Sequence, residues 1–343
     1  AFFSQALRQS EHAGARGALA LVQSRRDRPS LVWRRDAGDR VTTLAASPDG
    51  RVLATGGEGR VVGIWDAATG RRQRVLEGAA DAVLGLAFSP DGRLLAAAGA
   101  DGEVELWDGF NGQARGTLRG HRGRVRGVAF ADGGLQLASV GDDGWLRLWD
   151  VVERRPELAF DAAAGALLTV AVQPRGRLVA VGGEGRRVFL IDGEQGLPVA
   201  ELPGHQGQIQ ALAFSPDGQL LATAGGSEVR LWDLAGLPAA APRELSRLFG
   251  HTRWVCGLAF ASDGQHLASG SRDGTVRWWS LATGRERALV PGFDAPVCAL
   301  AGAVAADRLA LGGPGSSLQL WRFGQTAREA VSELLPQDAE VNA

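Results

Sequence analysis

Short runs of apolar residues recur along the chain, and the residues that close them are spaced at nearly constant intervals. Six runs end in tryptophan and one in isoleucine, at Trp65, Trp107, Trp149, Ile191, Trp232, Trp279 and Trp321. The successive intervals are 42, 42, 42, 41, 47 and 42 residues. Because a constant period of this length is typical of repeat architectures, the pattern indicates seven copies of one unit.

Each copy carries further signals before its closing run. An almost wholly apolar run such as VLGLAF (83–88) comes first, and a turn such as SPDG (89–92) follows it. Asp-Gly and Pro-Asp-Gly favour tight turns, because glycine adopts positive φ without steric cost. The closing run alternates, as in Val104–Glu105–Leu106, which suits a strand that is covered on one face. Four short strands in about 40 residues predict the blade of a β-propeller.

Two dipeptides recur in phase with the repeat. Gly-His stands at Gly120–His121, Gly204–His205 and Gly250–His251, and Trp-Asp ends four of the seven copies. With these dipeptides the repeat resembles the WD40 family, from about Arg40 to Phe323. The resemblance implies an all-β fold, a seven-bladed β-propeller of four-stranded antiparallel blades.

The residues before the first copy align with an outer strand. When two copies are aligned on their shared SPDG, Ser30–Arg35 falls where a blade has its last strand. We expect this segment to pair with the LQLWRF run (318–323) of the last copy and to close the ring, because closure removes the open sheet edges.

Three regions are expected along the chain. The propeller spans 29–323, a helical lead-in or linker occupies 1–28, and a helical tail occupies 324–343. The tail carries a capping-box pattern at Thr326 and Glu329, and apolar residues at helical spacing follow. The chain does not begin with methionine, and together with the helical lead-in this favours a piece of a longer protein.

A serine, a histidine and an aspartate in the sixth copy have the composition of a hydrolytic triad. His251, Ser269 and Asp273 precede Trp279, at spacings of 18, 4 and 6 residues. The same spacings recur in the third copy, at His121, Ser139, Asp143 and Trp149. A catalytic triad has no reason to occur twice at the repeat period. The resemblance implies instead a buried chain of hydrogen bonds from indole to hydroxyl to imidazole to carboxylate, and no catalytic residue is assigned.

The family resemblance also implies a contact face, formed by the turns that enter each first strand and by the hairpins before each third strand. Arginine and tryptophan are the residues that most often carry binding energy at interfaces. The hypothesis is therefore a partner-binding face centred on Arg124, Arg126, Asp142, Trp254 and Arg272. The alternative is that these are ordinary solvated arginines and one packed indole.

Composition and charge exclude several function classes. The formal net charge is −1, so the chain lacks the excess of positive charge that general binding to nucleic acid or to an anionic membrane requires. No apolar run is long enough to span a bilayer. Three of the five histidines lie in separate copies, His12 and His266 are isolated, and no phosphate-binding loop is present, so neither a metal nor a cofactor is expected.

The two cysteines, Cys256 and Cys298, lie one period apart on the first strands of neighbouring copies. We expect buried free thiols, although a redox pair across a blade boundary remains an alternative. With only two cysteines a disulfide framework is not possible, which favours a reducing compartment.

These observations predict a non-catalytic scaffold for a protein or peptide partner, as the sensor or docking part of a larger bacterial signalling or regulatory protein in the cytoplasm. One alternative is a stand-alone subunit of a multiprotein complex. Another is an enzyme or a small-ligand binder that uses the central channel, for which the first strands offer mainly Arg126 and Gln210. The residues leave the partner and the oligomeric state open.

Overall fold

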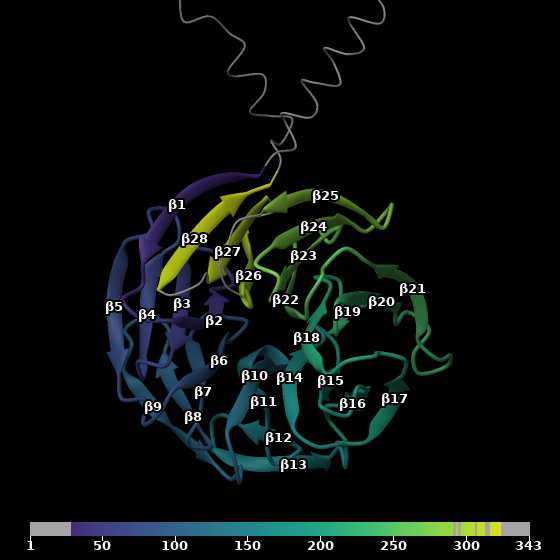
Figure 1. The fold of residues 1–343 in the computed structure, drawn as a ribbon. Coiled ribbons are helices and arrows are strands. Elements are labelled where there is room, and N and C mark those ends of the chain that lie inside the picture. The colour runs from purple at the N-terminus through teal and green to yellow at the C-terminus, as the bar shows by residue number, and fades with distance from the viewer. Residues whose placement is uncertain (1–28, 291–292, 294–295, 306, 313–315, 324–343) are drawn as a thin grey trace, which may run out of the picture.

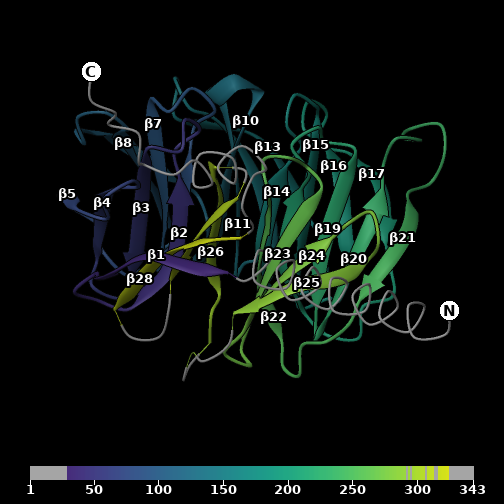
Figure 2. The same ribbon diagram turned by 90° about the horizontal axis from the view of Figure 1, so that it is seen from above.

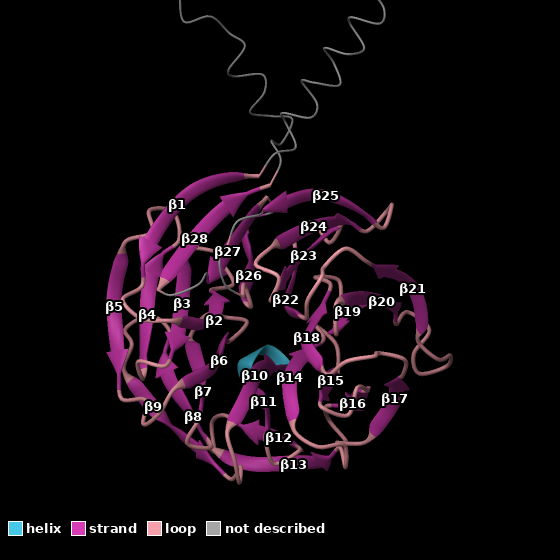
Figure 3. Ribbon diagram, in the orientation of Figure 1, coloured by secondary structure: helices cyan, strands magenta, loops and turns pink. Residues whose placement is uncertain are grey.

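Seven four-stranded sheets stand around a central axis in the computed structural model of the protein (Figure 1). The structure describes residues 29–290, 293, 296–305, 307–312 and 316–323. Within these residues, a 3-10 turn at Asp132–Gly134 is the only helical element (Figure 3). The seven-bladed all-β propeller expected from the sequence is therefore confirmed, whereas the helices expected at 1–28 and 324–343 lie outside the described residues.

Each blade contains four antiparallel strands in chain order, with the first strand nearest the axis. Blade 1 has β2 (Val41–Ala46), β3 (Val52–Gly57), β4 (Val61–Asp66) and β5 (Arg72–Glu77). Blade 2 has β6 (Val83–Phe88), β7 (Leu94–Gly99), β8 (Glu103–Asp108) and β9 (Ala114–Arg119). Blade 3 has β10 (Val125–Ala131), β11 (Gln136–Gly141), β12 (Trp145–Asp150) and β13 (Arg155–Asp161).

The remaining blades repeat this order, except that blade 7 takes its outer strand from the other end of the chain. Blade 4 has β14 (Leu167–Val172), β15 (Leu178–Gly183), β16 (Val188–Asp192) and β17 (Pro198–Leu202). Blade 5 has β18 (Ile209–Phe214), β19 (Leu220–Gly225), β20 (Glu228–Asp233) and β21 (Arg243–Leu248). Blade 6 has β22 (Val255–Phe260), β23 (His266–Ser271), β24 (Val276–Ser280) and β25 (Arg285–Val290). Blade 7 has β26 (Ala299–Ala305), β27 (Arg308–Gly312), β28 (Ser317–Arg322) and β1 (Ser30–Asp36).

The ring closes where β1 pairs with β28, as the alignment of Ser30–Arg35 predicts. Ser30 lies opposite Arg322 and Asp36 lies opposite Ser317, and the two strands run side by side at the rim in both views (Figures 1 and 2). Trp33, which is 7% exposed, donates a hydrogen bond from Nε1 to the carbonyl of Ala67 in blade 1 at 3.0 Å. Both residues belong to one apolar cluster shared by blades 7 and 1, so the outer strand is held by its own blade and by the next.

The antiparallel order gives the propeller two distinct faces. Face 1 carries the turns that lead into the first strands and the hairpins between second and third strands. Face 2 carries the turns between first and second strands and those between third and fourth strands. Backbone hydrogen bonds join the two kinds of turn on face 1, for example from Asp142 N to Arg124 O at 2.9 Å and from Arg272 N to Trp254 O at 2.9 Å.

The core lies between blades. Each of the seven apolar clusters combines residues of two neighbouring blades, so no blade buries its faces alone. The sheets approach so closely that Gly56 on β3 cannot carry a side chain, since a Cβ there would lie 2.6 Å from Val83 Cγ1 of blade 2. The apolar character of the first two strands in every copy follows from this double coverage.

Deletion of residues 1–40 should open the ring. It removes β1 and exposes apolar residues of β28 that Trp33 covers, and loss of a buried tryptophan alone costs about 3–5 kcal/mol. We expect calorimetry to show a melting temperature lower by on the order of 10 °C. Deletion of residues 1–28 leaves β1 in place and should preserve the melting temperature. Equal melting of the two deletions would contradict closure through β1.

Candidate functional site

A chain of hydrogen bonds runs through blade 3. The indole Nε1 of Trp149 donates to Ser139 Oγ at 2.7 Å, and Ser139 Oγ lies 2.7 Å from Nε2 of His121. Nδ1 of His121 lies 3.0 Å from both carboxylate oxygens of Asp143. Asp143 also accepts a hydrogen bond from the backbone N–H of Arg122 at 3.0 Å, so the turn into β10 is tied to the β11–β12 hairpin.

Blade 6 repeats this arrangement. Trp279 Nε1 donates to Ser269 Oγ at 2.8 Å, and Ser269 Oγ lies 2.8 Å from His251 Nε2. His251 Nδ1 lies 2.9 Å from Asp273 Oδ2. Asp273 accepts further hydrogen bonds from the hydroxyl of Thr275 at 2.6 Å and from the backbone N–H of Thr252 at 3.0 Å.

The burial of these groups rules them out as hydrolytic triads. Ser139 and Ser269 are 0% exposed, and each hydroxyl already contacts both an indole and an imidazole. A substrate carbonyl cannot reach either serine. Burial lowers the pKa of both His121 and His251, and the neighbouring carboxylates offset this effect only in part. The imidazoles are therefore neutral at pH 7, the form in which Nε2 accepts from serine and Nδ1 donates to aspartate.

Blade 5 has a shorter chain with a different carboxylate. His205 Nε2 lies 2.7 Å from Thr223 Oγ1, which accepts a hydrogen bond from Trp232 Nε1 at 3.0 Å. Gly226 supplies no carboxylate, and Glu228 Oε1 lies 3.5 Å from His205 Nδ1 while also pairing with Arg230 at 2.8 Å. Burial, together with the positive charge of Arg230, lowers the pKa of His205 to about 4. The Gly-His dipeptide marked His205 in the sequence, but the contacts of Glu228 and Arg230 could not be read from the repeat spacing.

Blade 2 places a carboxylate where no imidazole is present. Ala79 occupies the position that holds histidine in blades 3, 5 and 6. Glu105 on β8 is half-buried, and its Oε2 has no hydrogen-bond partner among the described residues. Burial, and then the negative charge of Asp101, raise the pKa of Glu105 to about 7. The sequence shows that the alternating run of β8 contains a glutamate, but it does not show that the side chain is half-buried.

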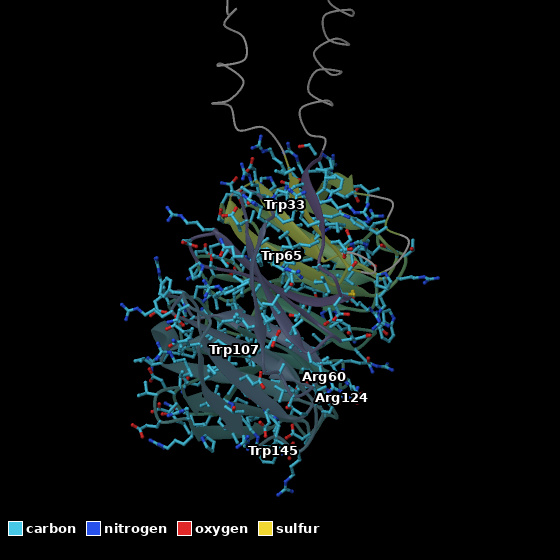
Figure 4. All side chains as sticks on the ribbon, turned by 90° about the vertical axis from the view of Figure 1, so that its left-hand side faces the viewer. Trp33, Arg60, Trp65, Trp107, Arg124 and Trp145 are labelled. Atoms are coloured by element: carbon cyan, nitrogen blue, oxygen red, sulfur yellow. A yellow bond between two sulfur atoms is a disulfide. The ribbon has the colours of Figure 1, made fainter. Side chains whose placement is uncertain are left out.

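Three of the proposed contact residues gather at one point of face 1. Arg126 on β10 forms a bidentate ion pair with Asp142 in the β11–β12 hairpin, with Nε–Oδ1 and Nη2–Oδ2 distances of 2.6 and 3.1 Å. Arg124 is exposed, and its guanidinium has no partner among the described residues. Figure 4 shows Arg124 and Arg60 toward the same side of the molecule, the side of face 1.

The other two contact residues form a stacked pair in blade 6. Trp254, in the turn before β22, is 40% exposed. The guanidinium carbon of Arg272, in the β23–β24 hairpin, lies 5.0 Å from the centroid of the Trp254 ring. This is a cation–π contact, which keeps the indole face partly covered and the indole edge in solvent.

The two groups do not form one continuous patch. Blades 4 and 5 separate blade 3 from blade 6 in one direction around the ring, and blades 7, 1 and 2 separate them in the other. The mouth of the central channel therefore lies between them. The sequence placed all five residues on one face. The separation of the two groups around the ring follows from the closure of the seven blades, which the sequence positions alone do not show.

The channel has a mixed lining. A hollow of about 300 Å³ lies among the seven first strands. Its lining includes the residue at the same repeat position in every blade, namely Thr42, Leu84, Arg126, Leu168, Gln210, Cys256 and Cys298. The Thr42 hydroxyl donates to the carbonyl of Val83 in blade 2 at 3.0 Å. Among the described residues, no three His, Cys, Asp or Glu side chains gather as metal ligands would, and no helix is long and apolar enough to cross a membrane.

The expectation of free thiols is wrong, because Cys256 and Cys298 form a disulfide. The bond joins β22 of blade 6 to the residue immediately before β26 of blade 7, the blade that closes the ring, and both cysteines line the channel. Spacing alone showed that the two residues are equivalent in neighbouring repeats, but not that the first strands bring their Cα atoms to 4.8 Å. Because disulfides persist mainly in oxidising compartments, this one gives no support to the predicted cytoplasmic location.

Comparison with known proteins gives one family. The model described as WD domain, G-beta repeat, matches five segments that together cover more than half of the chain, at 31–66, 70–108, 112–150, 196–233 and 242–280. The first three strands of blade 4 (β14, β15 and β16) and the first three strands of blade 7 (β26, β27 and β28) lie outside these segments. No curated protein matches the chain.

Glu105 should make stability depend on pH. Its folded pKa of about 7 lies above the ordinary value of 4.5, so the folded state holds a proton that the unfolded state releases between these values. The free energy of unfolding should therefore fall as pH rises from 4.5 to 7. Urea denaturation should show Glu105→Gln more stable than the natural protein by about 1–3 kcal/mol at pH 8, with little difference at pH 4.5.

The control is Glu153→Gln, which alters an exposed carboxylate in a turn of blade 3. Its free energy of unfolding should equal that of the natural protein at both pH values. A Glu105→Gln variant whose advantage is the same at pH 4.5 and pH 8 would show that the effect comes from packing and not from ionisation.

Reduction of the disulfide should destabilise the ring. The two cysteines are 42 residues apart, and closing a loop of this length stabilises by about 4 kcal/mol in the chain-entropy model. We expect dithiothreitol to lower the free energy of unfolding by about 2–4 kcal/mol in urea titrations. The double variant Cys256→Ser/Cys298→Ser should match the reduced protein and should not respond to dithiothreitol. A natural protein that is equally stable in both conditions would show that the bond does not constrain the unfolded chain.

Proposed function

We propose, from the premise that this chain belongs to the WD40 repeat family, that it is a non-catalytic platform that binds a protein or peptide partner on face 1. Propellers of this family are commonly scaffolds for protein interaction. In this proposal the blades supply a rigid ring, and specificity comes from the turns that the ring displays. The buried Ser-His-Asp groups stabilise those turns and take no part in chemistry.

The observation that carries the proposal is the exposed Trp254 with Arg272 stacked on it. Tryptophan and arginine are the commonest hot-spot residues, and an indole that a cation already orients loses little conformational freedom on binding. An indole 40% exposed beside the channel mouth has apolar area that a partner can cover.

The contact residues of blade 3 favour a partner that extends across the channel mouth. Arg124 in blade 3 offers a guanidinium that pairs with none of the described residues, and the Arg126–Asp142 ion pair holds a charged surface beside it. A partner with an apolar group for Trp254 and a carboxylate for Arg124 would contact both sides of the channel. The channel itself is a weaker candidate, because about 300 Å³ lies at the lower end of the volumes of small-molecule sites.

In the finer form of the proposal, this propeller is the sensor or docking part of a larger bacterial signalling or regulatory protein. Like the proposed partner face, this form rests on the membership of the chain in the WD40 repeat family. A gene that encodes the propeller alone would favour instead a stand-alone subunit of a multiprotein complex.

Substitution of the contact residues should abolish partner binding without unfolding the ring. The immobilised full chain is exposed to extract of the organism that makes it, and retained proteins are quantified by mass spectrometry. We expect Trp254→Ala/Arg126→Ala to retain the specific proteins at least tenfold less than the natural chain. The double variant should keep its melting temperature within a few degrees, since both side chains are partly exposed.

The matched control is Arg51→Ala, which removes an exposed arginine from face 2 of blade 1. It should retain the same proteins as the natural chain. The proposed partner face is disproved if the double variant retains the same proteins, in the same amounts, as the natural chain.

A further inference from the structure

A groove of about 1070 Å³ crosses face 2, opposite the proposed partner face. Its lining begins at Pro90 in blade 2 and ends at Pro238 in blade 5, so it extends over four consecutive blades. Its volume is at the upper end of the range for ligand sites. A hollow of this length fits an extended peptide better than a compact small molecule.

The groove passes over blade 4, whose first turn departs from the repeat. In blades 1, 2 and 5 this turn is Ser-Pro-Asp-Gly, and the serine hydroxyl donates to the aspartate, as from Ser215 to Asp217 at 2.5 Å. Blade 4 has Gln173, Pro174, Arg175 and Gly176. Gln173 closes the turn by accepting from Leu178 N at 3.3 Å and reaches blade 5 by donating to Gly218 O at 2.8 Å.

This replacement puts an unpaired positive charge on the groove. Arg175 stands where the turns of blades 1, 2, 5 and 6 have aspartate, it is exposed, and its guanidinium has no partner among the described residues. Its φ of +55° is a conformation that glycine adopts more readily than arginine. An arginine kept at this position costs backbone strain, which is common at binding sites.

The extra residues between Trp232 and Trp279 form one wall. After β20, Leu234, Leu237 and Pro238 line the groove. Half-buried Val172 and Leu178 of blade 4 add apolar surface. The side-chain amides of Gln195 and Gln219 also line it, and within the described part of the chain neither amide has a partner. The groove thus combines apolar contacts with free amides for a peptide backbone and a cation for a carboxylate.

We propose that this groove binds the acidic segment SELLPQDAEV (332–341) of the same chain. Leu334, Leu335 and Pro336 match its apolar walls, and the flanking Glu333 and Asp338 offer carboxylates to Arg175. Residues 324–343 contain four acidic side chains and one arginine, so their charge is opposite to that of Arg175. The proposal is independent of the partner face, because it concerns the opposite side of the ring.

The segment starts close enough to reach. β28 is a third strand and ends on face 2, where Phe323 N donates to Asp307 O at 2.7 Å. Phe323 stacks on Trp278 of blade 6 with ring centroids 4.5 Å apart, and blade 5 with its groove wall is the next blade. The eleven residues from Phe323 to Leu334 span up to about 36 Å. The near wall of the groove, at Leu234, Leu237 and Pro238, belongs to blade 5, which adjoins blade 6.

The test uses the full chain and a fluorescein-labelled peptide, SELLPQDAEV, followed by fluorescence anisotropy. The tail variant Leu334→Ser/Leu335→Ser removes the apolar side chains of the segment, so in this proposal its own segment no longer occupies the groove. We expect this variant to bind the peptide at least tenfold more tightly than the natural chain, whose own segment competes. Adding Arg175→Gly to the tail variant should weaken binding at least tenfold and should not lower the melting temperature, because glycine fits the left-handed backbone.

The matched control is Arg60→Gly, which removes an exposed arginine with a φ of +59° from face 1 and should leave peptide binding unchanged. The amidated peptide SQLLPQNAQV should bind at least tenfold more weakly than the acidic one. The proposal is overturned if the tail variant does not bind the peptide at millimolar concentration, or if Arg175→Gly binds it equally well. It is also overturned if the natural chain and the tail variant bind it alike.

Discussion

Burial of apolar surface between neighbouring sheets holds this molecule together. Every apolar cluster combines two blades, and the cluster that contains Trp33 joins the two ends of the chain. Because a single twisted sheet leaves both faces exposed, a blade gains most of its stability from its neighbours and the ring is stable only as a whole. The β1–β28 pairing and the Cys256–Cys298 disulfide both act at blade 7, where the order of the chain alone would leave the ring open.

Much of this fold could be predicted from the sequence, because the forces that create it repeat. Six intervals of 41–47 residues between seven closing residues, turn signals in constant phase and a spare strand at Ser30–Arg35 each report a local rule, and each is present in the structure. The paired groups at His121 and His251 were recognisable for the same reason, since two copies show which spacings matter.

The features that were not predicted depend on contacts between repeats or on departures from the repeat. The disulfide requires that two equivalent positions approach across a blade boundary, and the sequence gives only their separation. Glu105 becomes a perturbed carboxylate because blade 2 buries it beside the negative charge of Asp101. The groove is lined by Gln173 and Arg175, which replace the usual turn residues, and by the inserted residues after β20. The sequence gives the length of this insertion but not the course that it follows over the surface. The separation of Trp254 from Arg124 likewise follows from the closed ring.

The way the ring closes also decides how it would respond to force. Ser30 lies opposite Arg322 at one end of an antiparallel pair, so the two chain ends leave blade 7 next to each other. Tension applied through both ends would load the hydrogen bonds between β1 and β28 one at a time, in an unzipping geometry, and not all together in shear. The joint that makes the propeller continuous is therefore the first to bear this tension. If neighbouring segments of a longer polypeptide are pulled apart, the β1–β28 pair would separate first, and the remaining blades would lose the closure on which the stability of the ring depends.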